Sequence, residues 1–215
     1  MTDDVVADAR AALAKRTEQD PGSAGHQPRH LEGAGAHAGL VAVVDALALL
    51  HEIAARGVPS GRPEWTTVHN AVVRAGRALE DATDVERPPR AVDVIARVVE
   101  PELAVIGDAV ARLLGHALAP GRDDVVAGDA DVAALAEGLA RVVEGELSTA
   151  ALVGCGVHGF DVPRPWSVVF SPERHHLAAR GAGPRDVIVA LERAGRVGQG
   201  GRVVSAAQVI VGSGT

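Results

Sequence analysis

The chain has 215 residues, of which 47% are apolar and only four are aromatic (two Trp, two Phe and no Tyr), and its formal net charge is −7 at pH 7. Acidic residues outnumber basic ones, which argues against a general affinity for nucleic acids, and the single cysteine excludes an intrachain disulfide. The acidic start of the sequence and the lack of an apolar run of about 18 residues predict a cytoplasmic protein without a membrane segment.

The charge is distributed unevenly along the chain. Residues 1–160 carry 14 basic and 24 acidic side chains, a net charge of −10, whereas residues 161–215 carry 7 Arg and 4 acidic side chains, a net charge of +3. Arg supplies 20 of the 21 basic residues, which together with abundant Ala, Gly and Val is typical of a GC-rich bacterial genome. An acidic body with a mildly basic C-terminal segment can steer a charged partner.

Apolar residues at helical spacing predict a short helix over residues 3–18, followed by a flexible loop over residues 19–35 that is rich in Pro, Gly, Ser and His. A second helix is predicted over residues 36–56, because Gly57 and Pro59 would end it there. The spacing predicts an inward face made of Leu40, Val43, Val44, Leu47 and Leu50.

Three further helices are predicted over residues 63–82, 90–119 and 132–152. Trp65 falls on the inward face of the first of them. Pro101 lies inside the second and is expected to kink or split it, because proline removes a helical hydrogen bond. The third is expected to begin with a side-chain cap from Asp129 or Asp131.

The pattern is weaker after residue 154. Residues 166–170 are expected to form a short strand. A serine, proline and glutamate at the start of residues 171–181 predict a short helix there, and a proline followed by an acid predicts another over residues 184–194. Residues 203–211 suit either a strand or a helix, since periodicity cannot distinguish the two in so short a run.

Four long amphipathic helices joined by turns predict a mainly α protein, an up-and-down helical bundle with a small C-terminal α or α+β subdomain. The expected domains are an N-terminal helix and flexible loop over residues 1–35, the bundle over residues 36–153, and an Arg-bearing C-terminal subdomain over residues 154–215. A Rossmann-type sheet is not expected, because alternating strand–helix–strand units are absent.

Histidines on the predicted bundle helices are the candidate metal ligands. Each lies at helical spacing from an apolar residue of its own helix, so each side chain is expected at the inward face or its border. An inward triad supported by an aspartate could bind zinc or iron. Alternatively, these are border side chains that bond to backbone or water; no cofactor is predicted, and a divalent metal is the alternative. The three residues are His51, His69 and His116.

Cys155 and His158 form the densest local group of reactive side chains. A thiol beside an imidazole can provide a thiolate nucleophile, which makes the pair a candidate catalytic site. Two soft ligands do not complete a structural zinc site. The alternative interpretation is a small buried cysteine in a glycine-rich turn.

The arginines of the C-terminal segment are the candidates for contact with an anion or nucleic acid. The glycine-rich run over residues 198–202 could form a phosphate-contacting loop, although it matches neither the Walker nor the dinucleotide-binding pattern. The alternative is a solvated basic face. The candidate contact residues are Arg174, His175, His176, Arg185 and Arg202.

No nucleophile, metal set or cofactor-binding motif is specific enough to define an activity. The sequence therefore favours a non-enzymatic helical assembly or adaptor protein that acts through protein–protein contacts, including self-association. Two alternatives stay open: a small helical-bundle metal- or ligand-binding enzyme that uses the bundle histidines, and a nucleic-acid accessory protein that uses the C-terminal arginines. No membrane partner is expected.

Overall fold

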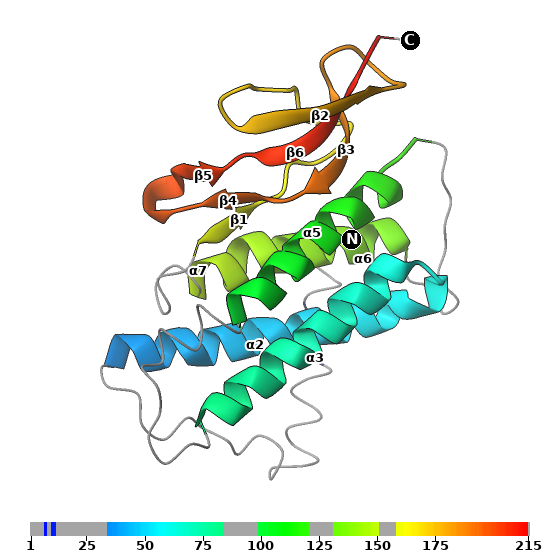
Figure 1. The fold of residues 1–215 in the computed structure, drawn as a ribbon. Helices are drawn as coiled ribbons and strands as arrows, with labels where there is room; N and C mark the ends of the chain where they lie inside the picture. The colour runs from blue at the N-terminus through cyan, green and yellow to red at the C-terminus, as the bar shows by residue number, and fades with distance from the viewer. Residues whose placement is uncertain are drawn as a thin grey trace.

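The computed structural model describes residues 7, 10, 11, 34–83, 99–120, 131–150 and 158–214 (Figure 1). The three described residues near the N-terminus are helical, within the helix predicted there. Most of the predicted loop over residues 19–35 and the predicted domain boundary between residues 153 and 154 lie outside the described residues.

Two long helices begin the described chain. α2 (Ala34–Gly57) and α3 (Pro63–Thr83) are joined by a single 3-10 turn, η1 (Val58–Ser60), and pack against each other. Trp65 on α3 is fully buried as predicted, and its indole fills the space beside Gly57, where a Cβ atom would lie 2.2 Å from the indole Cδ2.

The inward face of α2 largely follows the sequence pattern. Val43, Leu47 and Leu50 are buried, whereas the predicted core residue Val44 is 46% exposed. The side chain of Leu40 lies outside the described part of the helix. The register of the apolar face is therefore confirmed, with one border residue turned to solvent.

The next two helical segments form the middle of the molecule. α5 (Glu100–Ala117) begins with Pro101 in its first turn, a position that tolerates proline. Residues 84–98, where the predicted helix would begin, lie outside the described residues, so the kink or split expected at about residues 97–100 stays a prediction. α6 (Val132–Val142), a π-helical turn η3 (Val143–Leu147) and the short α7 (Ser148–Ala150) run on continuously. Asp131 is the cap of α6, since its Oδ1 accepts a hydrogen bond of 2.8 Å from the backbone N–H of Ala133.

Two small sheets follow, and the first is antiparallel throughout. It contains β1 (Gly159–Asp161), β4 (Gly195–Val197) and β5 (Val203–Ser205) in the order β1-β4-β5. A 3-10 turn, η5 (Gln199–Gly201), joins β4 to β5.

The second sheet is mixed, with the order β2-β6-β3. Its central strand β6 (Ala207–Gly212) runs parallel to β2 (His175–Gly181) and antiparallel to β3 (Ile188–Arg193). A bulge interrupts the β2–β6 register between Leu177 and Ala179. β2 is an edge strand of this sheet.

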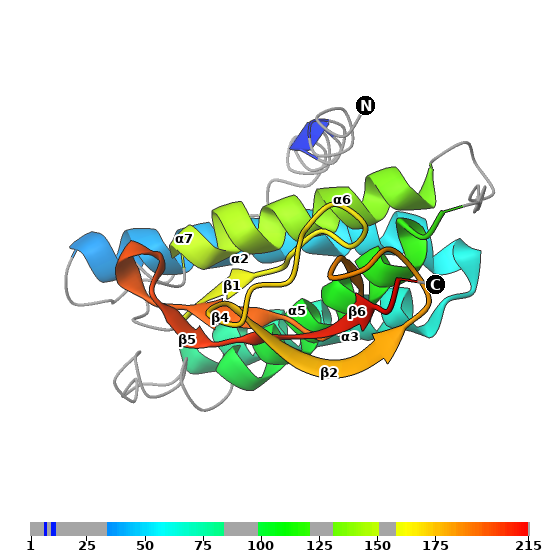
Figure 2. The ribbon, with the colours of Figure 1, turned by 90° about the horizontal axis from the view of Figure 1, so that it is seen from above.

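The helices and sheets form successive layers (Figure 1). α2 and α3 lie on one side, α5 and α6 lie in the middle, and the strands cover the other side of α5 and α6. β3 packs directly on α5, and β2 lies on the outer side of the sheet (Figure 2). None of the described helices combines the length and the apolarity that a bilayer crossing requires.

The predicted mainly α bundle is wrong as a fold class. The described chain contains four helices and two three-stranded sheets, and one hydrophobic core is shared between them. The core continues from Leu50 and Leu113 in the helices to Ile188 and Val209 in the strands. The aliphatic faces of the helices thus bury part of their surface against strands, which helical periodicity alone does not reveal.

The predicted C-terminal helices are also wrong. Residues 171–174 make one turn, in which the N–H of His175 donates to the carbonyl of Ser171 at 2.8 Å, and the chain then becomes β2. Residues 188–193 form β3, and residues 203–211 form most of β5 and β6. The serine–proline–glutamate signal therefore marks an isolated turn, and burial against neighbouring strands decides the conformation after it. The predicted strand at residues 166–170 is reduced to one bridge, between Val169 and Val187.

The first sheet docks on the helices through an aromatic ring. Phe160 on β1 is 4% exposed and lies against α5 at Gly107, where an added Cβ would come within 2.4 Å of the ring Cε1. The absence of a side chain at Gly107 thus creates the space that the ring occupies.

We expect Gly107→Ala to lower the free energy of unfolding by about 1–3 kcal/mol, since the new methyl group overlaps Phe160 and forces the sheet away from α5. Gly76→Ala on α3 is the matched control, because a Cβ there meets nothing within 4 Å. The control should gain about 0.5–1 kcal/mol from helix propensity. Urea unfolding of both variants measures the difference, and equal effects would contradict the docking role of Gly107.

Candidate functional site

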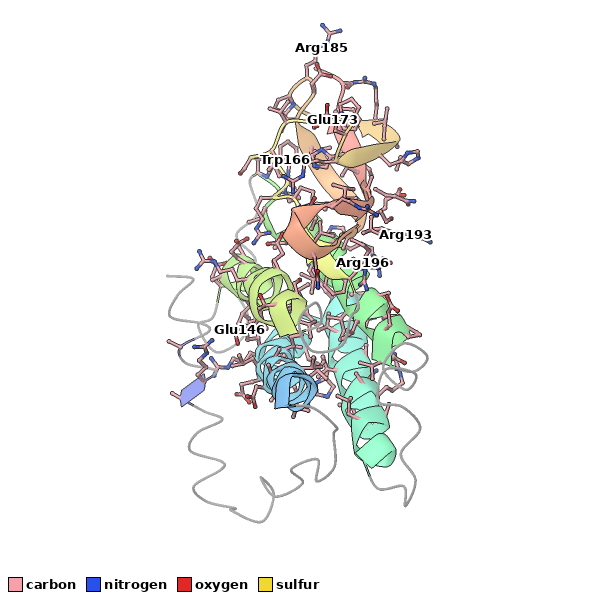
Figure 3. All side chains as sticks on the ribbon, turned by 90° about the vertical axis from the view of Figure 1, so that its left-hand side faces the viewer. Glu146, Trp166, Glu173, Arg185, Arg193 and Arg196 are labelled. Carbon is pink, nitrogen blue, oxygen red and sulfur yellow. The ribbon has the colours of Figure 1, made fainter. Side chains whose placement is uncertain are left out.

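The predicted anion-contacting residues do not form one patch. Arg185 lies in the turn before β3, at the end of the sheet layer farthest from the helices (Figure 3). Arg202 lies between η5 and β5, next to the other sheet. Arg174 is paired with Asp161, with 2.9 Å between Nη2 and Oδ1. These arginines are therefore dispersed over the C-terminal part of the chain.

His175 is a buried hydrogen-bond acceptor. Its side chain belongs to a residue that is 6% exposed, and its Nδ1 accepts a bond of 3.0 Å from the backbone N–H of Ser171. Burial lowers the pKa of His175, the carboxylate of Asp161 opposes this shift, and the charge of Arg174 adds to it. The neutral ring thus holds the turn before β2, whereas His176 beside it is exposed.

Two of the three predicted metal-ligating histidines come together. The rings of His51 on α2 and His69 on α3 are 4.5 Å apart between centroids, with an angle of 34° between their planes. His116 lies on α5 and is exposed. In the described part of the chain no three His, Cys, Asp or Glu side chains gather as a metal site, so the predicted triad is not formed there.

The proposed thiol–imidazole pair stays a prediction. His158 is exposed immediately before β1, and Cys155 lies outside the described residues.

A polar cluster that the sequence analysis missed joins α6 and η3 to the segment after β1. Arg164 is its centre: Nε lies 2.9 Å from Oε1 of Glu137, and Nη1 lies 2.5 Å from Oε2 of Glu144. The same Nη1 donates to the carbonyl of Val162 at 2.6 Å, and the N–H of Val162 donates to Oε1 of Glu144 at 2.8 Å. One guanidinium thus binds two helical carboxylates and the loop backbone at once.

Burial governs the protonation of this cluster. It raises the pKa of Glu144, while the charge of Arg164 and its hydrogen bonds act in the opposite direction. The pKa of Arg164 is raised as well: burial lowers it, but the two glutamates more than compensate. The ion pairs therefore offset part of the cost of removing these groups from water.

A second polar group holds β4 to α5. Arg196 lies over the ring of Phe160, with Cζ 4.2 Å from the ring centroid, and its Nη2 is 3.2 Å from Oε1 of Glu100. Nearby, the N–H of Ala194 donates to Oδ1 of Asp108 at 3.1 Å. Burial lowers the pKa of Arg196 and raises that of Asp108. Figure 3 shows Arg196 on the side of the sheets that faces the helices.

Each of these two clusters connects different secondary-structure elements, and within each cluster the charged side chains pair with one another. Their sequence separation explains why they were missed: Arg164 and Glu137 are 27 positions apart, and Arg196 and Glu100 are 96 apart. A single sequence contains no signal for such pairs. We interpret both clusters as clamps that hold the sheets on the helices.

The exposed edge strand β2 is the candidate functional surface. Five consecutive residues, 176–180, are exposed, so both faces of the strand are open to solvent. Leu177 is 39% exposed, and Arg180 makes a loose contact of 3.8 Å with Asp186 in which both side chains are more than half exposed. No described segment other than β6 pairs with β2.

Arg164→Gln should destabilise the fold by about 1.5–3 kcal/mol, because two partly buried carboxylates lose their cation. Arg74→Gln is the control: Arg74 also contacts a glutamate through two nitrogens, at Glu102, but its side chain is 53% exposed. The control should lose no more than about 1 kcal/mol. Chemical denaturation distinguishes the two, and similar losses would refute the clamp.

The lowered pKa of His175 makes stability depend on pH. Unfolding restores the ordinary value near 6.5, so below that pH the unfolded chain binds more protons and the fold is destabilised. His175→Gln should remove this part of the acid destabilisation, whereas His176→Gln, at the exposed neighbour, should retain it. Unfolding measured between pH 7.5 and 5 tests this, and parallel profiles for both variants would contradict it.

Comparison of the chain with protein-family models, with curated proteins and with solved structures finds no match.

Proposed function

We propose that this chain is a protein-interaction module, and that the free edge of β2 accepts an extended segment of a partner protein as an added strand. The single observation that carries the proposal is the exposure of residues 176–180 on an edge strand. Strand addition uses main-chain hydrogen bonds for affinity and alternate side chains for specificity.

The register of β2 supplies the main-chain groups. In a parallel pair alternate residues bond to the neighbouring strand. The carbonyls of Arg174 and Gly181 accept hydrogen bonds from β6 or the residue after it, Ala207 at 3.2 Å and Ser213 at 2.9 Å. The register aligns residues 176, 177, 179 and 180 alike with β6, so the alternation is counted from these two bonded ends, which turns the main-chain groups of His176 and Ala179 toward β6. We infer that Leu177 and Arg180 direct their main-chain groups away from β6, where a partner strand would bind.

The side chains of β2 suit an extended segment of mixed character. Leu177, Ala178 and Ala179 offer small and apolar surface, and His176 and Arg180 offer polar or positive groups at the two ends of this stretch. The bulge after Leu177 twists the edge, a feature that discourages unlimited sheet growth. Recognition of one short strand is favoured over open-ended association.

The clamps explain how such an edge is kept in place. β2 pairs only with β6 among the described strands, so its position depends on the docking of the sheets on α5. Arg196 makes the docking on α5 specific by pairing with Glu100, and Arg164 holds the segment after β1 on α6 and η3 by pairing with Glu137 and Glu144. A rigid scaffold reduces the entropy lost when a partner segment is ordered on it.

Arg180→Pro tests strand addition, and Arg180→Ala is its matched control. Proline removes the outward N–H and the side chain, whereas alanine removes the side chain alone. Peptides selected from a random display library on the wild-type chain should bind Arg180→Pro about 3- to 10-fold more weakly than Arg180→Ala, as expected for one hydrogen bond. Fluorescence anisotropy with the purified peptides measures this ratio.

Hydrogen exchange locates the bound peptide independently of any variant. Binding should slow the exchange of amide hydrogens in β2. The selected peptides should also share side-chain types at every second position, because alternate side chains of a strand point to the same face. Peptides that protect another element, or that bind both Arg180 variants equally, would contradict the proposal. Native mass spectrometry of the chain alone tests whether a second copy occupies β2. If it does, the wild-type chain forms a dimer and the Arg180→Pro variant does not.

A further inference from the structure

The contact between His51 and His69 is independent of β2 and of the proposed function. The two rings come from neighbouring helices and lie 4.5 Å apart between centroids, at 34° to each other. Both residues are partly exposed, so water and ions reach them. On the same two helices, Leu50, Ile53 and Trp65 are fully buried.

This spacing matches the requirement of a metal ion. A nitrogen ligand lies about 2.0–2.1 Å from Zn²⁺, so two ligands of one tetrahedral ion are about 3.3 Å apart. We infer from the centroid distance of 4.5 Å that rotation about the side-chain torsions brings one nitrogen of each ring to that separation. The helices are closely packed, which keeps the two imidazoles together before an ion arrives.

The hydrogen bonding of His69 favours the same role. Its Nδ1 is buried and has no hydrogen-bond partner among the described residues. We infer that a metal ion on the lone pair of this Nδ1 would give the buried nitrogen the partner it lacks, since either ring nitrogen of histidine can bind a metal.

We propose that His51 and His69 together bind one divalent late first-row transition metal ion, Cu²⁺, Ni²⁺ or Zn²⁺, with water completing the coordination shell. Imidazole is the preferred ligand type for these ions. The described residues supply no third His, Cys, Asp or Glu to the site, so coordination positions stay open to solvent or to an exogenous ligand. This distinguishes the site from a closed structural zinc site with four protein ligands.

The test uses the full chain and Ni²⁺ as the probe. Calorimetric titration with NiCl₂ at pH 7.5 should lose one binding site in His51→Gln and in His69→Gln relative to wild type. His116→Gln is the matched control, since it removes an exposed helical histidine on α5 and should leave the number of sites unchanged. Binding should weaken markedly at pH 5, where protons compete for the imidazoles.

Thermal unfolding gives a second readout that tolerates altered stability. Each variant is compared with its own metal-free sample, and the melting temperature of wild type and of His116→Gln should rise with each tenfold increase in Ni²⁺ above the dissociation constant. The rise should shrink in both His51→Gln and His69→Gln. Equal site numbers and equal shifts in all four proteins, or no binding to wild type at 1 mM Ni²⁺, would overturn the proposal.

Discussion

The packing of Phe160 into the space above Gly107 is the contact on which the arrangement of helices and sheets depends. Three contacts hold Phe160 in place: its ring lies against α5 at Gly107, the guanidinium of Arg196 lies over the ring, and the backbone N–H of Phe160 donates to the hydroxyl of Ser148 at 2.9 Å. Ser148 in turn donates to the carbonyl of Val143 at 2.6 Å. One aromatic residue thus connects the first strand, the end of the helical layer and β4.

Charged groups at the junction orient the layers that the apolar core holds together. Aliphatic side chains can pack well at many relative positions of two elements. A guanidinium that bonds to both Glu137 and Glu144 permits few such positions, because its planar donors need defined directions. Arg196 shows the same combination: its guanidinium packs on the ring of Phe160, and its ion pair with Glu100 fixes the orientation of the side chain. We infer that the polar contacts define how β4 sits on α5, and how the segment after β1 sits on α6 and η3, more sharply than the apolar core does.

The helical half of the fold follows from local patterns, and the sheet half does not. Apolar residues spaced at about 3.6 positions form a local pattern, and this pattern predicts the burial of Trp65, Leu47 and Leu113. The cap of α6 is also local, because Asp131 bonds to a backbone N–H only two positions away. The strands depend on partners far away in sequence: Ala207 pairs with His175, and Phe160 needs Gly107. The histidines illustrate the same limit, because helical spacing placed all three near the core but could not show that only His51 and His69 would meet in the described fold.

The parallel pairing of β2 with β6 has a consequence for the order of folding. α2 and α3 are joined by a single short turn, so their contacts require the closure of only a small loop. In contrast, His175 pairs with Ala207 across a much longer stretch of chain, and Phe160 packs on Gly107 more than fifty positions earlier. Long loops close at a higher entropic cost and slow the search for the native state. Until β3 packs on α5, the side of α5 that it covers is open to solvent, so we expect slow strand pairing to prolong the exposure of an aggregation-prone surface.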